Sequence, residues 1–162
     1  MSYMEINLSE GLRDLMRRYP QGVAVVTTEW KGKLVGMTVN TFNSLSLNPP
    51  LVLFIADRSR GNDLPFRDSP SFAVNLVDSR EVLDTFATKP VETRFQEVKY
   101  QLSGEGVPIL SDAYAYLIAT RGQVVDIGDH AIIVGEVKEV NLSREPSPLV
   151  HYMRNYRKVC LP

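Results

Sequence analysis

The sequence predicts a mainly β protein built as an antiparallel barrel or sandwich. Two observations favour this class: about six or seven short strand-like segments follow one another along the chain, and only two segments are convincingly helical. A doubly wound parallel sheet would need a helix after most strands. The 162 residues, 44% of them hydrophobic, are enough for one substantial core, so we expect a single domain over residues 1–162.

Two helices are expected. Apolar residues at helical spacing predict an amphipathic helix over residues 9–18, behind a cap at Asn7 or Ser9, and we expect it to cover the core as a lid. Asp78 followed by Glu81 has the spacing of a capping box, which predicts the start of the second helix.

Alternating or β-branched apolar runs predict the strands. They are expected at residues 23–28, 34–36, 51–56, 72–77, 113–121 and 130–141, and the first two should form a hairpin. Residues 91–108 carry charges and glycines and are expected to be a long loop, whereas the tail 148–159 is expected to be helical or irregular.

Composition excludes several classes of protein. A net charge of −1 and a pI near 6.1 argue against binding to nucleic acid or to anionic membranes over a whole face. The one cysteine, Cys160, allows no intrachain disulfide. No apolar run reaches the roughly 18 residues of a membrane helix, and no signal peptide is evident. We therefore expect a cytoplasmic protein that spans no membrane.

Few residues suit acid–base, nucleophilic or metal chemistry. His130 and His151 are not at metal-ligand spacing with a carboxylate, so no metal site is expected. No serine stands in a Gly-x-Ser-x-Gly turn, and the one Gly-x-Gly, Gly104–Gly106, precedes Pro108 instead of a helix. The protein is either no enzyme or one whose organic cofactor carries the reaction.

A polar run between two strands is the first candidate ligand site. Thr38, Asn40, Ser44 and Ser46 recur at two-residue steps, so in a strand they would line one side, with Met37 and its alternating apolar neighbours on the other. Such a mixture suits a flat ligand with a hydrogen-bonding edge. An ordinary surface strand with its hydroxyls in water gives the same pattern.

Two further clusters are candidates. The turn Asp57–Asp63 offers amides, a hydroxyl and arginines that suit a phosphate, to which Arg94 could add charge, although a solvated turn is equally consistent. His130 follows Asp129 at the start of a strand; it could orient a substrate amide or phosphate, or it could be structural.

Several motifs together resemble one family. They are Tyr19–Thr27, Gly36–Phe42, Ser44–Val52, Phe72–Leu76, Arg94–Phe95, Gly128–His130 and Gly135–Val137. In this order they are similar to the flavin reductase family with the FMN-binding split-barrel fold, the small component of two-component flavin monooxygenases. The resemblance covers about residues 10 to 156.

The resemblance implies a six-stranded antiparallel Greek-key split barrel with a few short helices, a homodimer, and reduction of FMN or FAD by NADH or NADPH. Reduced flavin would pass to a separate monooxygenase of aromatic substrates such as 4-hydroxyphenylacetate. A flavin-binding or storage protein without reductase activity is the alternative. The implied flavin-binding residues are Met37, Thr38, Val39, Asn40, Ser44, Ser46, Asp57, Arg58, Ser59, Asn62, Phe86, Ala87 and Arg94. The implied nicotinamide-binding residues are Asp129, His130, Tyr152 and Tyr156.

Overall fold

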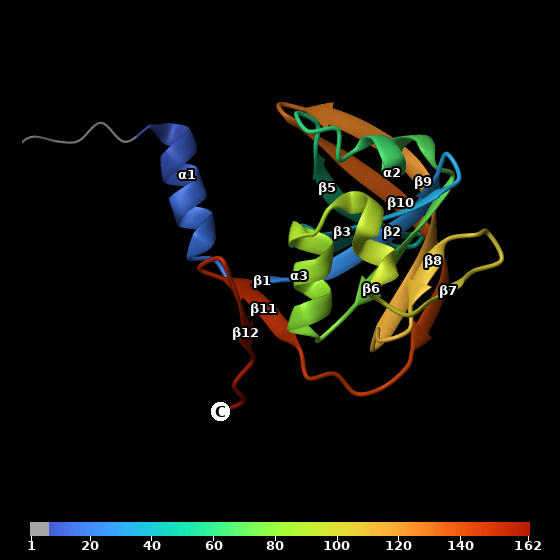
Figure 1. Ribbon diagram of the computed structural model, residues 1–162. Helices are drawn as coiled ribbons and strands as arrows, with labels where there is room; N and C mark the ends of the chain where they lie inside the picture. Colours follow the sequence, from blue (N-terminus) through green and yellow to red (C-terminus); the bar gives the residue numbers. More distant parts are fainter. Residues whose placement is uncertain (1–6) are drawn as a thin grey trace, which may run out of the picture.

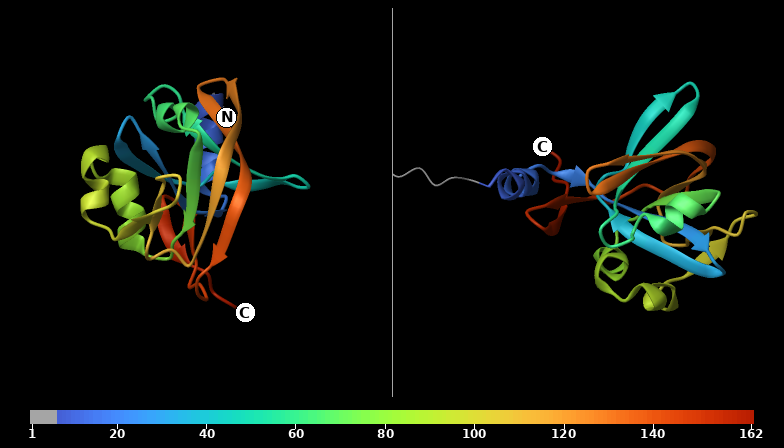
Figure 2. Two further views of the ribbon diagram at one scale, coloured as in Figure 1. Left: turned by 90° about the vertical axis from the view of Figure 1, so that its right-hand side faces the viewer. Right: turned by 90° about the horizontal axis from the view of Figure 1, so that it is seen from above.

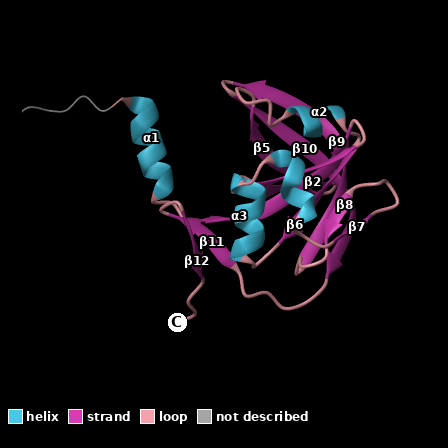
Figure 3. Ribbon diagram, in the orientation of Figure 1, coloured by secondary structure: helices cyan, strands magenta, loops and turns pink. Residues whose placement is uncertain are grey.

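A computed structural model describes residues 7–162, and its main sheet has seven antiparallel strands in the order β3-β2-β6-β9-β10-β5-β4 (Figure 1). The strands of this sheet are β2 (Ala24–Trp30), β3 (Lys33–Val39), β4 (Asn43–Leu47), β5 (Pro50–Asp57), β6 (Ser71–Leu76), β9 (Ala115–Ile127) and β10 (His130–Leu142). Strands dominate the molecule, which confirms the mainly β class (Figure 3). The sheet has seven strands because β4 pairs with the edge of β5.

Aromatic residues fill the core of the main sheet. Phe54 is fully buried, and its ring meets those of Phe66 and Phe72 edge-on at centroid distances of 5.1 and 5.2 Å. Close packing also explains Gly135 on β10: a Cβ there would lie 2.5 Å from the Phe72 ring and 2.8 Å from the Cβ of Ala119. Only glycine fits at this position without displacing the core.

A second, small sheet joins the two ends of the chain. It consists of β1 (Gln21–Gly22), β11 (Leu149–Tyr152) and β12 (Asn155–Lys158) in the order β1-β11-β12, and we call it the terminal sheet. The expectation of a helical or irregular tail is therefore wrong. Met153 and Arg154 turn the β11–β12 hairpin with φ values of 51° and 63°. Residues other than Gly, Asn and Asp rarely adopt such φ values, so the sequence contains no signal for this turn.

Helix α1 (Leu8–Arg17) lies beside the terminal sheet and away from the main sheet (Figure 1, Figure 2). Its start is capped as expected, because the Asn7 side chain accepts a hydrogen bond from the Ser9 amide at 2.9 Å. No residue of α1 is buried, so the expected lid over the core is wrong. One backbone bond ties the helix end to the terminal sheet: the Met153 amide donates to the Arg17 carbonyl at 2.9 Å.

The region between β6 and β9 contains more structure than expected. Helix α3 (Arg80–Thr88) is capped by Ser79, whose hydroxyl accepts from the Val82 amide at 3.2 Å, so the capping box at Asp78 is wrong by one residue. The expected loop 91–108 instead holds the 3₁₀ helix η1 (Val91–Gln96) and β7 (Tyr100–Leu102), which pairs with β8 (Pro108–Leu110). Helix α2 (Leu64–Asp68) follows β5.

Among residues 7–162, none of the helices combines the length and the apolar composition needed to cross a membrane. The first six residues of the expected domain lie outside the described residues.

Candidate functional site

A pocket of about 320 Å³ lies between the main sheet, α3 and the terminal sheet. Its lining residues are Val23, Met37, Thr38, Val39, Asn40, Thr41, Ile55, Ala56, Asp57, Asn62, Ala87, His130, His151 and Tyr156. Its size falls within the range of small-molecule sites, and its wall mixes apolar side chains with a few hydrogen-bonding groups, as such sites do.

Hydroxyl groups fasten the β3 wall of the pocket to its neighbours. The Thr38 hydroxyl donates to the Leu83 carbonyl of α3 at 2.8 Å. Just after β3, the Thr41 hydroxyl donates to the Ile55 carbonyl at 3.1 Å and accepts from the Ile55 amide at 2.9 Å. These bonds replace strand pairing where β3 ends, and they fix the wall against α3 and β5.

The terminal sheet supplies the facing wall. The Asn40 amide nitrogen lies 3.3 Å from Nδ1 of His151, and burial lowers the pKa of this histidine. The Tyr156 ring lies 5.9 Å from the imidazole, centroid to centroid. Burial, with a smaller contribution from the charge of Asp84, raises the pKa of Tyr156. Both side chains are therefore neutral at pH 7.

The end of β5 places a carboxylate on the pocket wall. Asp57 Oδ1 accepts hydrogen bonds from the Ser59 hydroxyl at 2.6 Å and from the Ser59 amide at 2.7 Å, and these bonds lower the pKa of Asp57. Two donors expected to serve a phosphate are thus already used within the turn. Arg58 reaches the turn between β9 and β10, where its guanidinium donates to the Gly128 carbonyl at 3.2 Å.

His130 enters the pocket from the start of β10. It pairs with Asp57 across the β5–β10 ladder, and its Nδ1 lies 2.7 Å from Oδ1 of Asp129. About half of the imidazole is exposed. The contact to a carboxylate orients the ring, so that its other nitrogen is free to meet a ligand.

Two expected site residues support the pocket from behind. Phe86 is fully buried and packs edge-on against Phe95 at 5.1 Å, directly under Gly36 of β3. Arg94 donates to the Gly36 carbonyl at 2.8 Å and to the Lys89 carbonyl at 2.9 Å, and burial lowers the pKa of its guanidinium. Arg94 therefore clamps β3 to the end of α3.

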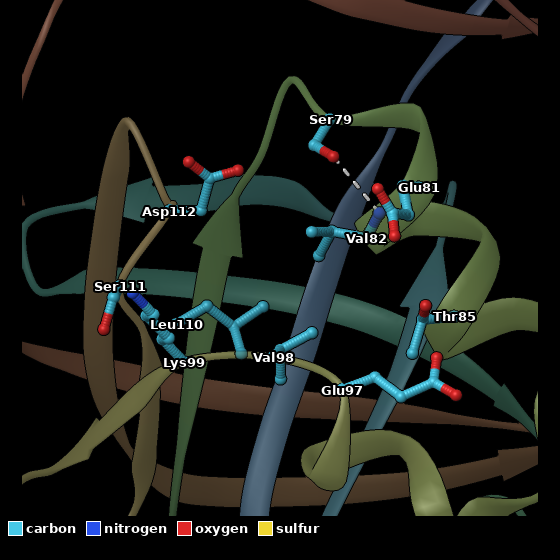
Figure 4. Close-up of a pocket in the computed structure, with 10 residues that line it drawn as sticks. All are labelled: Ser79, Glu81, Val82, Thr85, Glu97, Val98, Lys99, Leu110, Ser111 and Asp112. Atoms are coloured by element: carbon cyan, nitrogen blue, oxygen red, sulfur yellow. Dashed lines mark hydrogen bonds between the residues drawn. The ribbon is translucent and has the colours of Figure 1, made fainter.

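A second hollow, of about 440 Å³, lies on the opposite face of α3 and is shown in Figure 4. Glu81, Val82 and Thr85 line it from one side of the helix, whereas Ala87 faces the first pocket. It contains the carboxylates of Glu81, Glu97 and Asp112 and one lysine, Lys99. This excess of negative charge disfavours a phosphate-bearing ligand. Across residues 7–162, no three His, Cys, Asp or Glu side chains are placed to hold a metal ion.

The sequence matches the family described as "Flavin reductase like domain" over residues 16–159. The chain belongs to the flavin reductase family. It is 37% identical to a flavin reductase of Pseudomonas putida over 147 residues, which cover 89% of this chain and 86% of that one. It is 34% identical to the reductase component of 4-hydroxyphenylacetate 3-monooxygenase of Thermus thermophilus, covering 96% of this chain and 99% of that one.

A solved structure is also very similar. The crystal structure of flavin reductase HpaC complexed with NADP+ superposes with a TM-score of 0.92 at 54% identity, covering 93% of this chain and 97% of that one. The fold described above is therefore that of the flavin reductases.

The pocket of this flavin reductase brings together a subset of the expected site residues. They are Met37, Thr38, Val39, Asn40, Asp57, Asn62, Ala87, His130 and Tyr156. The others lie elsewhere: Ser44 and Ser46 on the edge strand β4, Arg58 and Ser59 in the turn after β5, Asp129 next to His130, Tyr152 at the end of β11, Phe86 in the core and Arg94 in η1. The expected alignment of Ser44 and Ser46 with Thr38 fails because β3 ends at Val39. The β4–β5 register also shifts between Ser44 and Ser46.

Five lining residues were not expected: Val23, Thr41, Ile55, Ala56 and His151. Four of them lie within strands or motifs that the sequence did indicate, so their neighbours gave a usable signal. His151 had none, because its strand was not foreseen.

Proposed function

We propose that this protein is an NAD(P)H:flavin oxidoreductase that reduces FMN or FAD and supplies the reduced flavin to a separate monooxygenase. The observation that carries the proposal is the pocket with walls from both sheets, in a chain that belongs to the flavin reductase family. The split barrel implied by the family resemblance, six strands with Greek-key order and β4 outside it, is part of the same proposal.

The lining residues fit a flavin. Met37, Val39 and Ile55 offer apolar contact for a flat ring, while the amides of Asn40 and Asn62 offer hydrogen bonds for its edge and side chain. The remaining flavin contacts proposed are Thr38, Asp57 and Ala87. Ser59 and Arg94 are proposed to act through Asp57 and β3, which they support. Ser44, Ser46, Arg58 and Phe86 do not line the pocket. Bound flavin supplies the hydride-accepting ring, and the chain supplies its position.

His130 is proposed as the contact for the nicotinamide nucleotide. Its ring is held by Asp129 and half-exposed at the pocket, so it can donate to or accept from an amide or phosphate. Tyr156 is proposed to cover the open ring face, and Tyr152 is a weaker candidate because it does not line the pocket. No acid–base residue is required, since stacking of two rings in a fixed geometry provides the proximity that hydride transfer needs.

The ionised Asp57 suits hydroxyl groups better than phosphate. Its free oxygen can accept hydrogen bonds from the sugar-like chain of a flavin or from a ribose, whereas a phosphate would be repelled. We therefore propose that the phosphate of the ligand lies away from Asp57 and nearer Arg58 and Arg60 of the following turn.

A homodimer is also proposed. The apolar side chains of α1 are exposed, Leu12 by 61% and Leu15 by 59%, and Leu47 at the end of β4 is exposed by 89%. Exposed apolar side chains grouped on one helix favour burial against another surface. Sedimentation velocity over a range of protein concentrations tests this state.

The test of the reductase is anaerobic titration with NADH and with NADPH, in the presence of FMN or FAD, followed by flavin absorbance. Bleaching of the flavin that depends on protein and on added flavin supports the proposal. A yellow protein that binds flavin but does not bleach with either nucleotide would instead be a storage protein. His130→Ala separates these further: in a reductase the KM for the nicotinamide nucleotide rises, whereas a storage protein binds flavin as before.

A further inference from the structure

We propose that His151 is a flavin-binding residue whose neutral ring is fixed by Asn40, so that its Nε2–H donates a hydrogen bond to an acceptor atom of the flavin ring. The inference rests on the proposed function, which it deepens by assigning a residue that the family motifs do not include. Asn40 directly follows β3 of the main sheet, whereas His151 lies on β11 of the terminal sheet, and their contact joins the two walls of the pocket.

The backbone of His151 is held on both sides. In the terminal sheet it pairs with Gln21 of β1 and with Tyr156 of β12, and the Tyr156 ring packs at 5.9 Å from the imidazole. The strand thus fixes the direction of the side chain, and the Tyr156 ring limits its rotation. A ring held in this way can present one nitrogen to a ligand at little cost in entropy.

The Asn40 contact selects the tautomer. An amide nitrogen can only donate hydrogen bonds, so Nδ1 of His151, 3.3 Å away, must accept with its lone pair. The neutral ring then carries its proton on Nε2. Within residues 7–162 this second nitrogen has no hydrogen-bond partner, and His151 lines the pocket. The Nε2–H is therefore a donor available to a bound ligand.

The surroundings keep the ring neutral. Burial lowers the pKa of His151, and among residues 7–162 no carboxylate forms an ion pair or hydrogen bond with it. The facing titratable groups are the Tyr156 phenol on β12, with Asp84 of α3 near it, and Asp57 and His130 among the other lining residues. On the other elements that contact it, Gln21 and Asn40 are uncharged. Protonation would turn Nδ1 into a donor facing the Asn40 donor, so it should break this contact.

The first measurement is ¹⁵N NMR of the two imidazoles in the full-length protein without flavin. We expect His151 to show the Nε2–H tautomer and to titrate below the ordinary value of 6.5. Addition of FMN should shift Nε2 and suppress the titration. Asn40→Asp, which places an acceptor opposite Nδ1, should move the proton to Nδ1. A wild-type ring protonated on Nδ1 at pH 7 would overturn the proposal.

The second measurement is the affinity for FMN, followed by quenching of flavin fluorescence. His151→Phe keeps an aromatic ring without a donor and should weaken FMN binding by about 3- to 10-fold. His151→Gln keeps a donor and should restore part of the loss. Gln21→Ala alters the strand neighbour of His151 outside the pocket, and its affinity should match wild type.

The pH dependence separates the two histidines of the pocket. FMN affinity of the wild type should fall as the pH drops through the pKa of His151, and His130→Gln should retain this fall while His151→Phe loses it. FMN affinity of His151→Phe equal to wild type would refute the inference, as would a loss confined to NADP+ binding. If His151→Phe does not fold, the wild-type NMR result decides. Failure of the wild type to reduce flavin would instead refute the proposed function.

Discussion

The main sheet and the terminal sheet each supply one wall of the pocket, yet different forces hold them in place. The main sheet buries a continuous apolar core that includes Phe54, Phe72 and Ile133. In the terminal sheet no residue is buried, and only Leu149 and Tyr156 pack against a core cluster. Polar contacts hold the rest of the terminal sheet in place. One pocket therefore has a wall fixed by packing and a wall fixed by a few hydrogen bonds.

The polar contacts of the terminal sheet are specific. Arg144 binds Asp78 through both terminal nitrogens, at 2.7 and 2.9 Å, which anchors the segment that leads into β11. Arg80 donates to the Tyr156 carbonyl at 2.7 Å. Elements with little buried apolar surface open locally at low free-energy cost, so we expect the terminal sheet to open before the main sheet does.

The largest effect is expected in the main sheet. Phe54→Ala removes a fully buried ring and should lower the free energy of unfolding by about 3–5 kcal/mol, because the rings of Phe66 and Phe72 lose their shared contact. Urea unfolding measures the loss. Leu102→Ala, at an exposed position of β7, is the control and should stay within about 0.5 kcal/mol of wild type. A loss below 1 kcal/mol for Phe54→Ala would contradict a packed main sheet.

A smaller effect is expected where the terminal sheet is anchored. Asp78→Ala removes the acceptor for Arg144 and for the Ser147 amide, and should cost about 1.5–3 kcal/mol, the range for hydrogen bonds to charged groups. Hydrogen exchange should show faster opening of β11 and β12, with the main sheet unchanged. Asp14→Ala breaks the exposed Asp14–Arg17 pair on α1 and is the matched control, expected to change little. Equal exchange rates of β11 and β12 in the two variants would show that Asp78 does not anchor the terminal sheet.

The same anchor makes the terminal sheet sensitive to acid. The bonds from Arg144 lower the pKa of Asp78 to about 2 from its ordinary 3.8. Because the folded-state pKa is depressed, this stabilisation is complete above the unfolded-state value and disappears as the pH falls through about 2. The stability difference between wild type and Asp78→Asn should therefore be constant above about pH 5 and shrink below it. A difference that stays constant down to pH 2 would exclude Asp78 as the cause.

The contrast between the sheets also explains what the sequence could predict about the fold. The strands of the main sheet have long apolar or alternating runs, and β2, β3, β5, β6, β9 and β10 were all expected near their observed positions. The terminal strands have two to four residues each, and their pairing joins residues 21–22 to residues 150–151. Local patterns carry no information on a pairing across so much of the chain.

The site was predictable to the same degree. Residues at the strand ends of the main sheet, such as Asn40, Asp57 and His130, were indicated by their polar side chains. His151 was missed, because a histidine in a short polar tail has no signature until the fold brings its strand to Asn40. Ser44 and Ser46 were wrongly aligned with Thr38, since the chain leaves β3 after Val39 and the pattern does not show that break.

The smallest effect on unfolding is expected in α1. Leu12→Ser and Leu15→Ser are combined in one variant. Each substitution should change the free energy of unfolding of the monomer by less than about 0.5 kcal/mol, because no residue of α1 is buried within its own chain. If α1 instead packs against a second copy, the same variant should shift sedimentation velocity toward the monomer at concentrations where the wild type is dimeric. Arg13→Ser, on the same helix, is the control for loss of helix propensity. A loss of stability in the isolated monomer would mean that α1 packs against its own chain and not against a second copy.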